Sequence, residues 1–461
     1  MDAIAKVVKT AQNAITAKRC KNGYCLIVTL DVKNAFNTAN WNHIVNSLLK
    51  LNVPEYLVEI IKDYFSDRIL TYHTDNGRAT YNVTGGVPQG SVLGPLLWNV
   101  MYDGVLKLEL PGTSEIIGFA DDIALIVTAN NLDETKAVAD AGISLIKSWL
   151  SAMNLALAEH KTEAVLITSQ KVEEFIHIQV GECAIRTQKQ LKYLGVILDN
   201  RLSFKPHIEY IREKANKTCT SLCRVMPNTR GPRYLRRRIL AEVVKSVILY
   251  ASPIWADCLK YKTYTQSISS VYRRTALRVC CAYRTVSDEA ALVVAGMIPI
   301  DLLAKERQLL YEKKLTAQEA RERSLSEWQT RWSTSTKSRW TYTLIPDIKS
   351  WIERKHGDVD FYLTQFLTGH GCFREYLNRF RLKTSAQCSY CNEQSQTARH
   401  VFFVCPKFDI ERGTLSRQLS DRVSIDNIMH KMLGSQAHWD SVAKYVTSVL
   451  LELRRDSNRL D

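Results

Sequence analysis

The sequence predicts an α/β (α+β) fold over residues 1–203, an α-helical region over 204–310, a connection over 311–345 and a small C-terminal region over 346–461. Short apolar strands separated by helical segments indicate the first region. Helical spacing with many basic residues indicates the second, and a cluster of cysteines with a histidine marks the last. A chain of 461 residues is too long for one ordinary core, so two or three domains are expected.

The composition is that of a globular protein with a polyanionic partner. Lys and Arg number 62 against 47 Asp and Glu, a net charge of +15 that suits nucleic acid and would also suit an acidic membrane surface. No apolar run reaches the ~18 residues of a spanning helix, and the N-terminus lacks a signal-peptide pattern, so an intracellular protein without a membrane partner is expected. The twelve cysteines are too sparse for a disulfide framework, which leaves core thiols or metal ligands.

The chain begins with an apolar helical pattern over residues 1–20, followed by an apolar strand over 24–30 that ends at Asp31. A helix from about Asn42 to Leu51 comes next. An acid at the end of a strand, before a turn into a helix, is a common position for a metal ligand in α/β proteins. Asp31 could equally be the acid that begins such a helix.

A glycine-rich loop over residues 85–95 follows a helix over 55–64 and a hairpin that turns near Gly77. This loop opens an apolar helix over 96–106. Glycine lets the backbone approach a ligand closely, and Gln89 offers both an amide donor and an acceptor. An ordinary junction between loop and helix would also explain the glycines.

Two adjacent acids, Asp121 and Asp122, lie between apolar runs over residues 115–119 and 123–127. The pattern predicts a β-hairpin with acids at its tip. Half-buried adjacent carboxylates repel each other unless a cation neutralises them. A divalent metal site and a solvated Asp-Asp turn are both consistent with the hairpin alone.

Three motifs in this order and spacing resemble the palm motifs of a reverse transcriptase, namely Leu30–Asn37, Gly86–Ser91 and Phe119–Asp122. The first is similar to that of non-long-terminal-repeat (non-LTR) retrotransposons, particularly the jockey-like and insect ribosomal-DNA-inserting type-1 elements. The resemblance implies a polymerase palm over residues 1–203 and a thumb over 204–310. It also implies an RNA-directed DNA polymerase that copies element RNA into DNA at a nicked target, with an RNA template, a DNA primer or target and deoxynucleoside triphosphates as partners.

The resemblance assigns roles to single residues. Asp31 and Asp121 would hold two Mg²⁺ ions for phosphoryl transfer, with Asp122 close by. Phe36 would lie beneath the sugar and exclude a 2′-hydroxyl group, which fits a DNA-making enzyme. The other residues assigned to the nucleotide and the template are Val32, through its carbonyl, Gln89 and Gly90.

Two later segments continue the match. A helix over 133–153 leads to Lys161, in the loop before a strand over 164–168, and the resemblance places this lysine near the departing pyrophosphate. A solvated surface lysine is the other interpretation. Residues 191–199 resemble the primer-grip hairpin of the family, and the primer-grip residues are Tyr193, Leu194 and Gly195.

The region 204–310 carries many basic residues at helical spacing, among them Arg212, Lys214, Lys217, Arg224, Arg236, Arg237, Arg238, Arg273, Arg274, Arg278 and Arg284. Basic stripes on a helical bundle suit a sugar-phosphate backbone, although a solvated face would also carry them. Cys219 and Cys223 lie at i and i+4 with no histidine near in sequence, which favours core thiols over a metal site.

A polar stretch with three tryptophans lies within residues 311–345 and is expected to form a loosely packed connection. Beyond it, Cys388 and Cys391 form a Cys-x2-Cys pair that His400 and Cys405 complete, which predicts a tetrahedral Zn²⁺ site. The spacing differs from that of a retroviral zinc knuckle. The same retrotransposon family carries a similar C-terminal cluster, which implies nucleic-acid binding.

Only thirty residues precede Asp31, where a complete enzyme of this family has a fingers region. We therefore expect a fragment of a longer polyprotein, with its fingers largely missing and an endonuclease further upstream. Such a fragment is expected to polymerise poorly by itself, and the full element protein is expected to act in the nucleus at the site of integration. The alternative is a catalytically inactive fragment that only binds nucleic acid.

Overall fold

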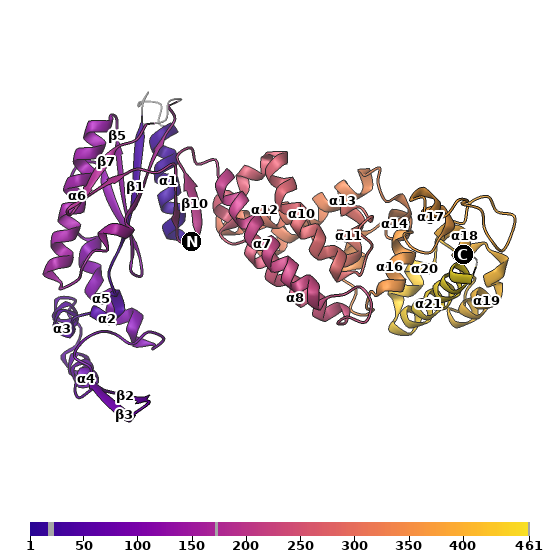
Figure 1. Ribbon diagram of the computed structural model, residues 1–461, viewed down its shortest axis with the longest axis horizontal. Coiled ribbons are helices and arrows are strands. Elements are labelled where there is room, and N and C mark those ends of the chain that lie inside the picture. The colour runs from indigo at the N-terminus through magenta and orange to yellow at the C-terminus, as the bar shows by residue number, and fades with distance from the viewer. Residues whose placement is uncertain (17–22, 171–173, 460–461) are drawn as a thin grey trace. The chain divides into compact units, whose positions relative to one another are not determined.

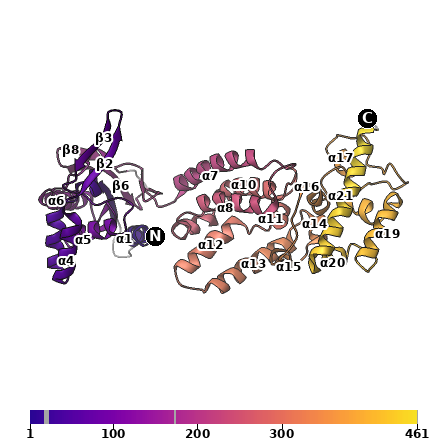
Figure 2. The same ribbon diagram turned by 90° about the horizontal axis from the view of Figure 1, so that it is seen from below.

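The chain forms two compact units in this computed structural model, which describes residues 1–16, 23–170 and 174–459. The first unit comprises residues 1–207 and the second residues 208–461. Figure 1 shows the first unit from indigo to magenta, and Figure 2 shows both units turned by 90°. The predicted palm region lies within the first unit, whereas the predicted thumb, connection and C-terminal region make up a single second unit.

The elements of the first unit follow the predicted order. Its helices are α1 (Asp2–Thr16), α2 (Ala35–Thr38), α3 (Trp41–Lys50), α4 (Glu55–Phe65), α5 (Leu93–Leu106) and α6 (Leu132–Ala152). Its strands are β1 (Tyr24–Asp31), β2 (Ile69–Thr74), β3 (Gly77–Asn82), β4 (Ser114–Phe119), β5 (Asp122–Ala129), β6 (Glu163–Thr168), β7 (His177–Val180), β8 (Cys183–Arg186), β9 (Gln190–Tyr193) and β10 (Val196–Asp199). The end of the predicted first helix, residues 17–20, lies outside the described residues.

Strands β4, β5, β1 and β6 form one antiparallel sheet in this order, with β1 in its interior. The remaining strands pair as the hairpins β2–β3, β7–β8 and β9–β10. Because β1 has a partner on both sides and a helix over each face, its residues are apolar almost without interruption, which explains the unbroken apolar run in the sequence.

Side-chain alternation along β1 gives the sheet two apolar faces. Leu26, Val28 and Leu30 belong to the core that also contains residues of α5 and α6. Cys25 and Ile27 alternate with these residues, so they belong to the opposite face, and both are buried. Figure 1 shows α1 and α6 on opposite sides of β1. The buried residues of α1 are Ile4, Val7, Val8 and Ala11, in agreement with their predicted helical spacing.

The described part of the second unit is built from helices and their connections. The helices of the predicted basic region are α7 (Lys205–Val225), α8 (Tyr234–Ile248), α9 (Ser252–Trp255), α10 (Lys262–Val279), α11 (Asp288–Ala295) and α12 (Ile300–Tyr311). Those that follow are α13 (Ala317–Thr334), α14 (Arg339–Leu344), α15 (Ile348–Ile352), α16 (Phe361–Thr368), α17 (Arg374–Arg379), α18 (Ala398–Phe403), α19 (Asp409–Gln418), α20 (Ile428–Gly434) and α21 (Gln436–Arg459). The predicted helical character of residues 208–310 is therefore present in the structure.

The predicted loose connection over 311–345 is wrong. This segment contains α13, which begins with a capping box in which Thr316 and Glu319 satisfy each other's backbone N–H groups. Trp328 and Trp332 are buried, and the Trp332 Nε1–H donates to the Ile345 carbonyl at 2.8 Å. The segment is polar in composition because α13 exposes most of its surface and buries only a narrow stripe, so composition alone did not indicate a packed helix.

Among the described helices, no single one is long and apolar enough to cross a bilayer. The bent pair Tyr234–Ile248 and Ser252–Lys260 would be, by length and composition, when the two helices are taken together.

Candidate active site and metal centre

The structure brings Asp31 and Asp122 together at one end of β1 and β5, the two inner strands of the central sheet. They are paired residues in the register of the antiparallel strands β1 and β5, so their side chains point to the same face. Asp121 precedes Asp122 in the turn between β4 and β5. Three carboxylates from two chain segments therefore lie at the end of one strand pair, an arrangement that suits a hard divalent cation.

The turn that carries Asp121 has a fixed backbone. Ala120 has a φ of +54°, which is uncommon for a residue with a Cβ atom. The Trp98 Nε1–H donates to the Ala120 carbonyl at 3.2 Å and ties this turn to α5. Trp98 is fully buried, so the hydrogen bond anchors the acidic turn to the core of the unit.

The electrostatics around these three carboxylates favour cation binding. Partial burial raises the pKa of Asp122, and the charges of Asp121 and Asp31 raise it further. Burial, with a contribution from Asp122, also raises the pKa of Tyr193 to about 12. A bound cation would remove this repulsion, so the residues present fit the magnesium site that the resemblance implies.

A lysine already contacts one of the acids. The Lys161 Nζ donates to Asp31 Oδ2 at 2.9 Å, from the 3₁₀ helix Glu159–Lys161. Asp31 is 29% exposed and Lys161 61% exposed, so solvent screens the pair. Lys161 is therefore a neighbour of the acids, at the position where a cation would also bind.

The glycine-rich loop packs against the segment that holds Phe36. The Gly86 N–H donates to the Ala39 carbonyl at 2.7 Å, and the Val87 N–H donates to the Phe36 carbonyl at 2.7 Å. Gly86 has a φ of +86°, and a Cβ atom there would lie 2.8 Å from the Asn37 carbonyl oxygen, so only glycine allows this approach.

The side chains next to this loop are available to a ligand. Phe36 is half-buried and stacks on Trp98, with ring centroids 5.4 Å apart. Gln89 and Gly90 are exposed in the middle of the loop. Val32 and Leu157 are paired in an isolated β-bridge. The residues on either side of them make the hydrogen bonds of this bridge, so the bridge does not use the Val32 carbonyl.

The predicted primer-grip segment is a hairpin in the structure. Strands β9 and β10 pair across a turn formed by Leu194, with a φ of +44°, and Gly195, with a φ of +83°. Tyr193 itself is buried, so its ring packs inside the unit, and the turn residues are half-buried.

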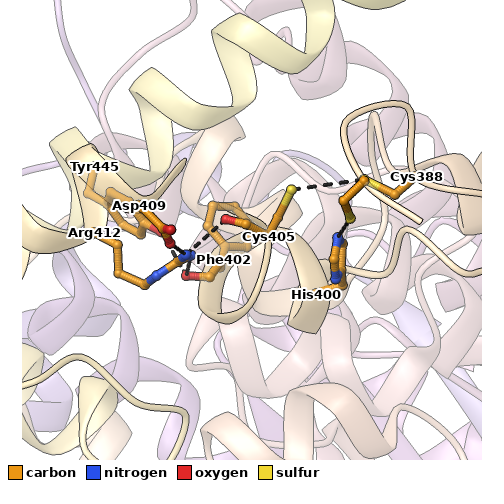
Figure 3. Close-up of polar contacts among 8 residues, drawn as sticks. Cys388, His400, Phe402, Cys405, Asp409, Arg412 and Tyr445 are labelled. Atoms are coloured by element: carbon orange, nitrogen blue, oxygen red, sulfur yellow. Dashed lines mark hydrogen bonds and ion pairs between the residues drawn. The ribbon is translucent and has the colours of Figure 1, made fainter. Parts of the chain in front are cut away.

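The four predicted zinc ligands converge in the second unit. Cys388, Cys391, His400 and Cys405 present ligand atoms that all lie within 4.8 Å of one another. Cys388 Sγ and Cys405 Sγ are 3.9 Å apart, and Cys391 Sγ and His400 Nε2 are 3.3 Å apart (Figure 3). Tetrahedral zinc with its usual bond lengths requires about 3.8 Å between two sulfurs and about 3.5 Å between sulfur and nitrogen.

Local structure sets these ligands in place. His400 lies on α18, which is capped by Thr397, and the Cys405 N–H donates to the His400 carbonyl at 2.8 Å. The Cys388 N–H donates to the Glu393 carbonyl at 2.9 Å, which folds the Cys-x2-Cys segment back on itself. Burial lowers the pKa of His400, which favours the neutral imidazole that binds zinc.

A second layer of contacts supports Cys405. The Arg412 guanidinium donates to the Cys405 carbonyl at 2.8 Å and to the Phe402 carbonyl at 3.3 Å (Figure 3). The Tyr445 hydroxyl, on α21, donates to the same Phe402 carbonyl at 2.7 Å. The cluster is therefore tied to the long terminal helix of the second unit.

Comparison with known families supports the predicted resemblance. Residues 3–198 match the family model described as reverse transcriptase (RNA-dependent DNA polymerase). The first unit is a reverse transcriptase domain. The match runs from α1 to β10 and includes the acids, the glycine-rich loop and the hairpin β9–β10.

Relatives that match most of the chain come from insect retrotransposable elements. The Pol polyprotein from type-1 retrotransposable element R1 2 of Nasonia vitripennis is 29% identical, over 71% of this chain and 87% of the relative. The putative 115 kDa protein in type-1 retrotransposable element R1DM of Drosophila melanogaster is 25% identical, over 94% of this chain but only 44% of the relative. The chain therefore spans less than half of the Drosophila protein, and both relatives are proteins of R1 elements.

Among solved structures, a telomerase from Candida tropicalis in complex with a telomeric RNA fragment is 14% identical to this chain. The match has a TM-score of 0.36 and covers 70% of this chain and 52% of the telomerase.

Sequence reasoning missed two aromatic residues of the reverse transcriptase domain that lie near the acids. Trp98 holds the acidic turn, and Tyr102 lies close enough to Asp121 and Asp122 that their charges, after burial, raise its pKa. Both aromatic residues lie on α5 at i and i+4, where their rings stack 5.0 Å apart. The sequence did contain a signal for them, because two large aromatic residues lie on one face of the helix that follows the glycine-rich loop.

Proposed function

We propose that this chain carries out RNA-directed DNA synthesis for a non-LTR retrotransposon and that Asp31, Asp121 and Asp122 hold its divalent metal ions. The observation that supports this assignment is the pairing of Asp31 with Asp122 across β1 and β5, next to Asp121 in the turn. When bound, two Mg²⁺ ions would supply activation of the primer 3′-hydroxyl group and charge neutralisation at the departing pyrophosphate.

The chain's own residues would bind and orient the reactants. Phe36, whose ring stacks on Trp98, would limit the space at the 2′ position of the incoming sugar. Gln89, exposed in the middle of the glycine-rich loop, would contact the pair of nucleotide and template base. Lys161 would hold a negatively charged phosphate oxygen when it leaves Asp31 and would give up a proton to pyrophosphate.

The second unit would hold nucleic acid. Its basic helices carry arginines that suit phosphate groups, and the geometry of its Cys-Cys-His-Cys cluster supports a structural Zn²⁺ ion. In this proposal the zinc ion fixes the fold around α18, and the surrounding basic residues contact the RNA template or the DNA target.

The proposal is tested by primer extension on a poly-rA template with an oligo-dT primer and Mg²⁺. Asp31→Asn and Asp121→Asn should each lower the extension rate by about 10³-fold or more, because a metal ligand is lost. Asp75→Asn, at the exposed tip of the β2–β3 hairpin, is the matched control and should leave the rate unchanged. Wild-type rates in both acid variants would contradict the assignment.

A second readout locates the metal without any need for turnover. With Fe²⁺ in place of Mg²⁺, ascorbate and peroxide cleave a polypeptide next to the bound ion. We expect cleavage near Asp31 and near Asp121 in the wild-type chain, and its loss in the two variants. Cleavage elsewhere, with none near these acids, would contradict the proposed metal site.

A chain that only binds nucleic acid is the other candidate, and the net charge of +15 is the observation that favours it. Under this alternative, binding of a primer–template duplex would fall steeply with salt and no metal-dependent extension would occur. Extension by the wild-type chain that disappears in Asp121→Asn would exclude it.

A further inference from the structure

A cavity of about 850 Å³ lies beside α7, α10 and the segment that follows α10 in the second unit. Figure 2 shows α7 and α10 side by side. Four arginines line the cavity, Arg273, Arg274, Arg278 and Arg284. Asp288 is the acidic residue of the lining, and it forms an ion pair with Arg273. The cavity therefore has a strongly positive wall.

The hydrogen bonds of two of these arginines leave their charge available. Arg274 donates to the Asn216 side-chain carbonyl and to Thr220 Oγ1, the latter at 3.2 Å. Arg278 donates to Asn228 Oδ1 at 3.1 Å. These acceptors are neutral, so they orient the guanidinium groups without cancelling their charge.

A thiol lies in the same wall. Cys223, on α7, is partly exposed and lines the cavity, whereas Cys219 is buried one helical turn earlier. Their Sγ atoms are 3.8 Å apart, and the Thr275 hydroxyl donates to Cys219 Sγ at 3.5 Å. The pair is thus a buried thiol beside an accessible one.

The surroundings favour the thiolate form of Cys223. The hydrogen bond with Cys219 and the positive charges of Arg278 and Arg274 lower the pKa of Cys223 below its usual value. Reactive cysteines typically occupy partly exposed, electropositive positions of this kind. Core thiols, the interpretation that the sequence favoured, describe Cys219 but not Cys223.

The two thiols are poorly placed to form a disulfide with each other. On a helix, Cβ atoms at i and i+4 lie about 5–6 Å apart, whereas an unstrained disulfide needs about 3.5–4.5 Å. A reagent that reacts with Cys223 would therefore remain attached instead of being displaced quickly by Cys219.

We propose that Cys223 is a thiol-modification site for anionic low-molecular-weight disulfides. The cavity arginines bind the carboxylate groups of these disulfides. The Cys223 thiolate attacks one sulfur of the reagent, so a new S–S bond forms while the S–S bond of the reagent breaks. The released half leaves as a thiolate and takes a proton from water. No further oxidant is needed, because the reagent itself is reduced.

The experiment uses the full chain and two reagents of opposite charge at pH 6, glutathione disulfide and cystamine. Mass spectrometry of peptides measures the rate at which each reagent adds to Cys223. Cys183, an exposed thiol of the first unit, is the internal reference. With glutathione disulfide, Cys223 should react about tenfold faster than Cys183, because thiolate content outweighs the lower nucleophilicity of a low-pKa thiol.

Charge selectivity tests the role of the arginines. Cys223 should prefer glutathione disulfide over cystamine by about tenfold or more relative to Cys183, and the double variant Arg274→Gln/Arg278→Gln should lose this preference. The reagent comparison needs no variant, so a misfolded double variant would not obscure the result. Equal or slower reaction at Cys223 than at Cys183, or equal rates with both reagents, would overturn the proposal.

Discussion

Three carboxylates at the end of β1 and β5 repel one another, and the protein itself supplies one cation to them, the Lys161 ammonium on Asp31. Burial raises the pKa of Asp122, and the negative charges of Asp121 and Asp31 raise it further, because each disfavours the ionised carboxylate. Lys161 and a metal ion would both be attracted to Asp31. Competition between the two cations is therefore a property of this site that mutation can measure.

Replacing Lys161 should change the magnesium requirement. Lys161→Ala removes the competing cation, so the Mg²⁺ concentration for half-maximal extension should fall about two- to fivefold, the range expected for a solvent-screened ion pair. Lys161→Arg should stay close to the wild type, and Lys62→Ala, in an exposed pair on α4, should have no effect. A lower maximal rate with an unchanged magnesium requirement would assign Lys161 to pyrophosphate alone.

Phe36 should control sugar selection. Its ring stacks on Trp98, so its position is fixed by a fully buried neighbour. Phe36→Ala opens space next to Trp98 and should raise ribonucleotide incorporation, relative to deoxyribonucleotide incorporation, by about 10- to 100-fold. Phe36→Tyr keeps the ring and should retain the wild-type ratio. Unchanged selection in Phe36→Ala would place the discriminating group elsewhere.

The hairpin β9–β10 depends on a histidine from the start of α7. The Ile197 N–H donates to His207 Nδ1 at 3.3 Å, and the His207 side chain is fully buried. Burial lowers the pKa of His207 to about 4, whereas the unfolded value is 6.5. The neutral ring is thus part of the fold, and its protonation would remove the acceptor for the Ile197 N–H.

This histidine should make the first unit sensitive to mild acid. As pH falls below about 6.5 the unfolded chain takes up a proton that the folded chain refuses, so the free energy of unfolding decreases until about pH 4. Between pH 7.5 and pH 5 the loss should be about 2 kcal/mol. His207→Gln should remove this part of the loss in urea unfolding at the two pH values, and an equal loss in the variant would refute the assignment.

Helix α13 shows that a segment of mostly polar residues can contain large buried side chains. Trp332 packs in the second unit with its Nε1–H bonded to the Ile345 carbonyl. Trp332→Ala should lower the free energy of unfolding of that unit by about 3–5 kcal/mol, because a large buried ring is lost. Lys337→Ala, at an exposed position after the helix, should have almost no effect. Denaturant unfolding measures both, and a neutral Trp332→Ala would restore the interpretation of a loose connection.

The strands and the acidic hairpin could be predicted because their signals are local. An unbroken apolar run ending at Asp31, and two acids between apolar runs, fix the element and its end from neighbouring residues alone. The partners of those elements could not be predicted, since the bond from Trp98 to Ala120 and the ion pair of Lys161 with Asp31 join residues 22 and 130 positions apart. The buried stripe of α13 was missed because two tryptophans among polar residues give little contrast.

At the scale of the molecule, the two compact units have separate cores and separate chemistry. The first holds the acids on its sheet, and the second holds the arginine cavity and the Cys-Cys-His-Cys cluster. Each unit should therefore unfold in a transition of its own. Ligands that bind one unit would shift only that transition.

Zinc removal should separate the two transitions. Cys391→Ser removes one ligand from the cluster, so bound zinc measured by atomic spectroscopy should fall from one ion per chain towards zero. The thermal transition of the second unit should then drop by about 10 °C or more, because metal binding stabilises only the folded cluster. Cys183→Ser, in the first unit, is the matched control and should change neither zinc content nor melting. Because the acids lie in the other unit, cleavage by Fe²⁺ near Asp31 should persist in Cys391→Ser, and its loss would show that the cluster also supports the first unit.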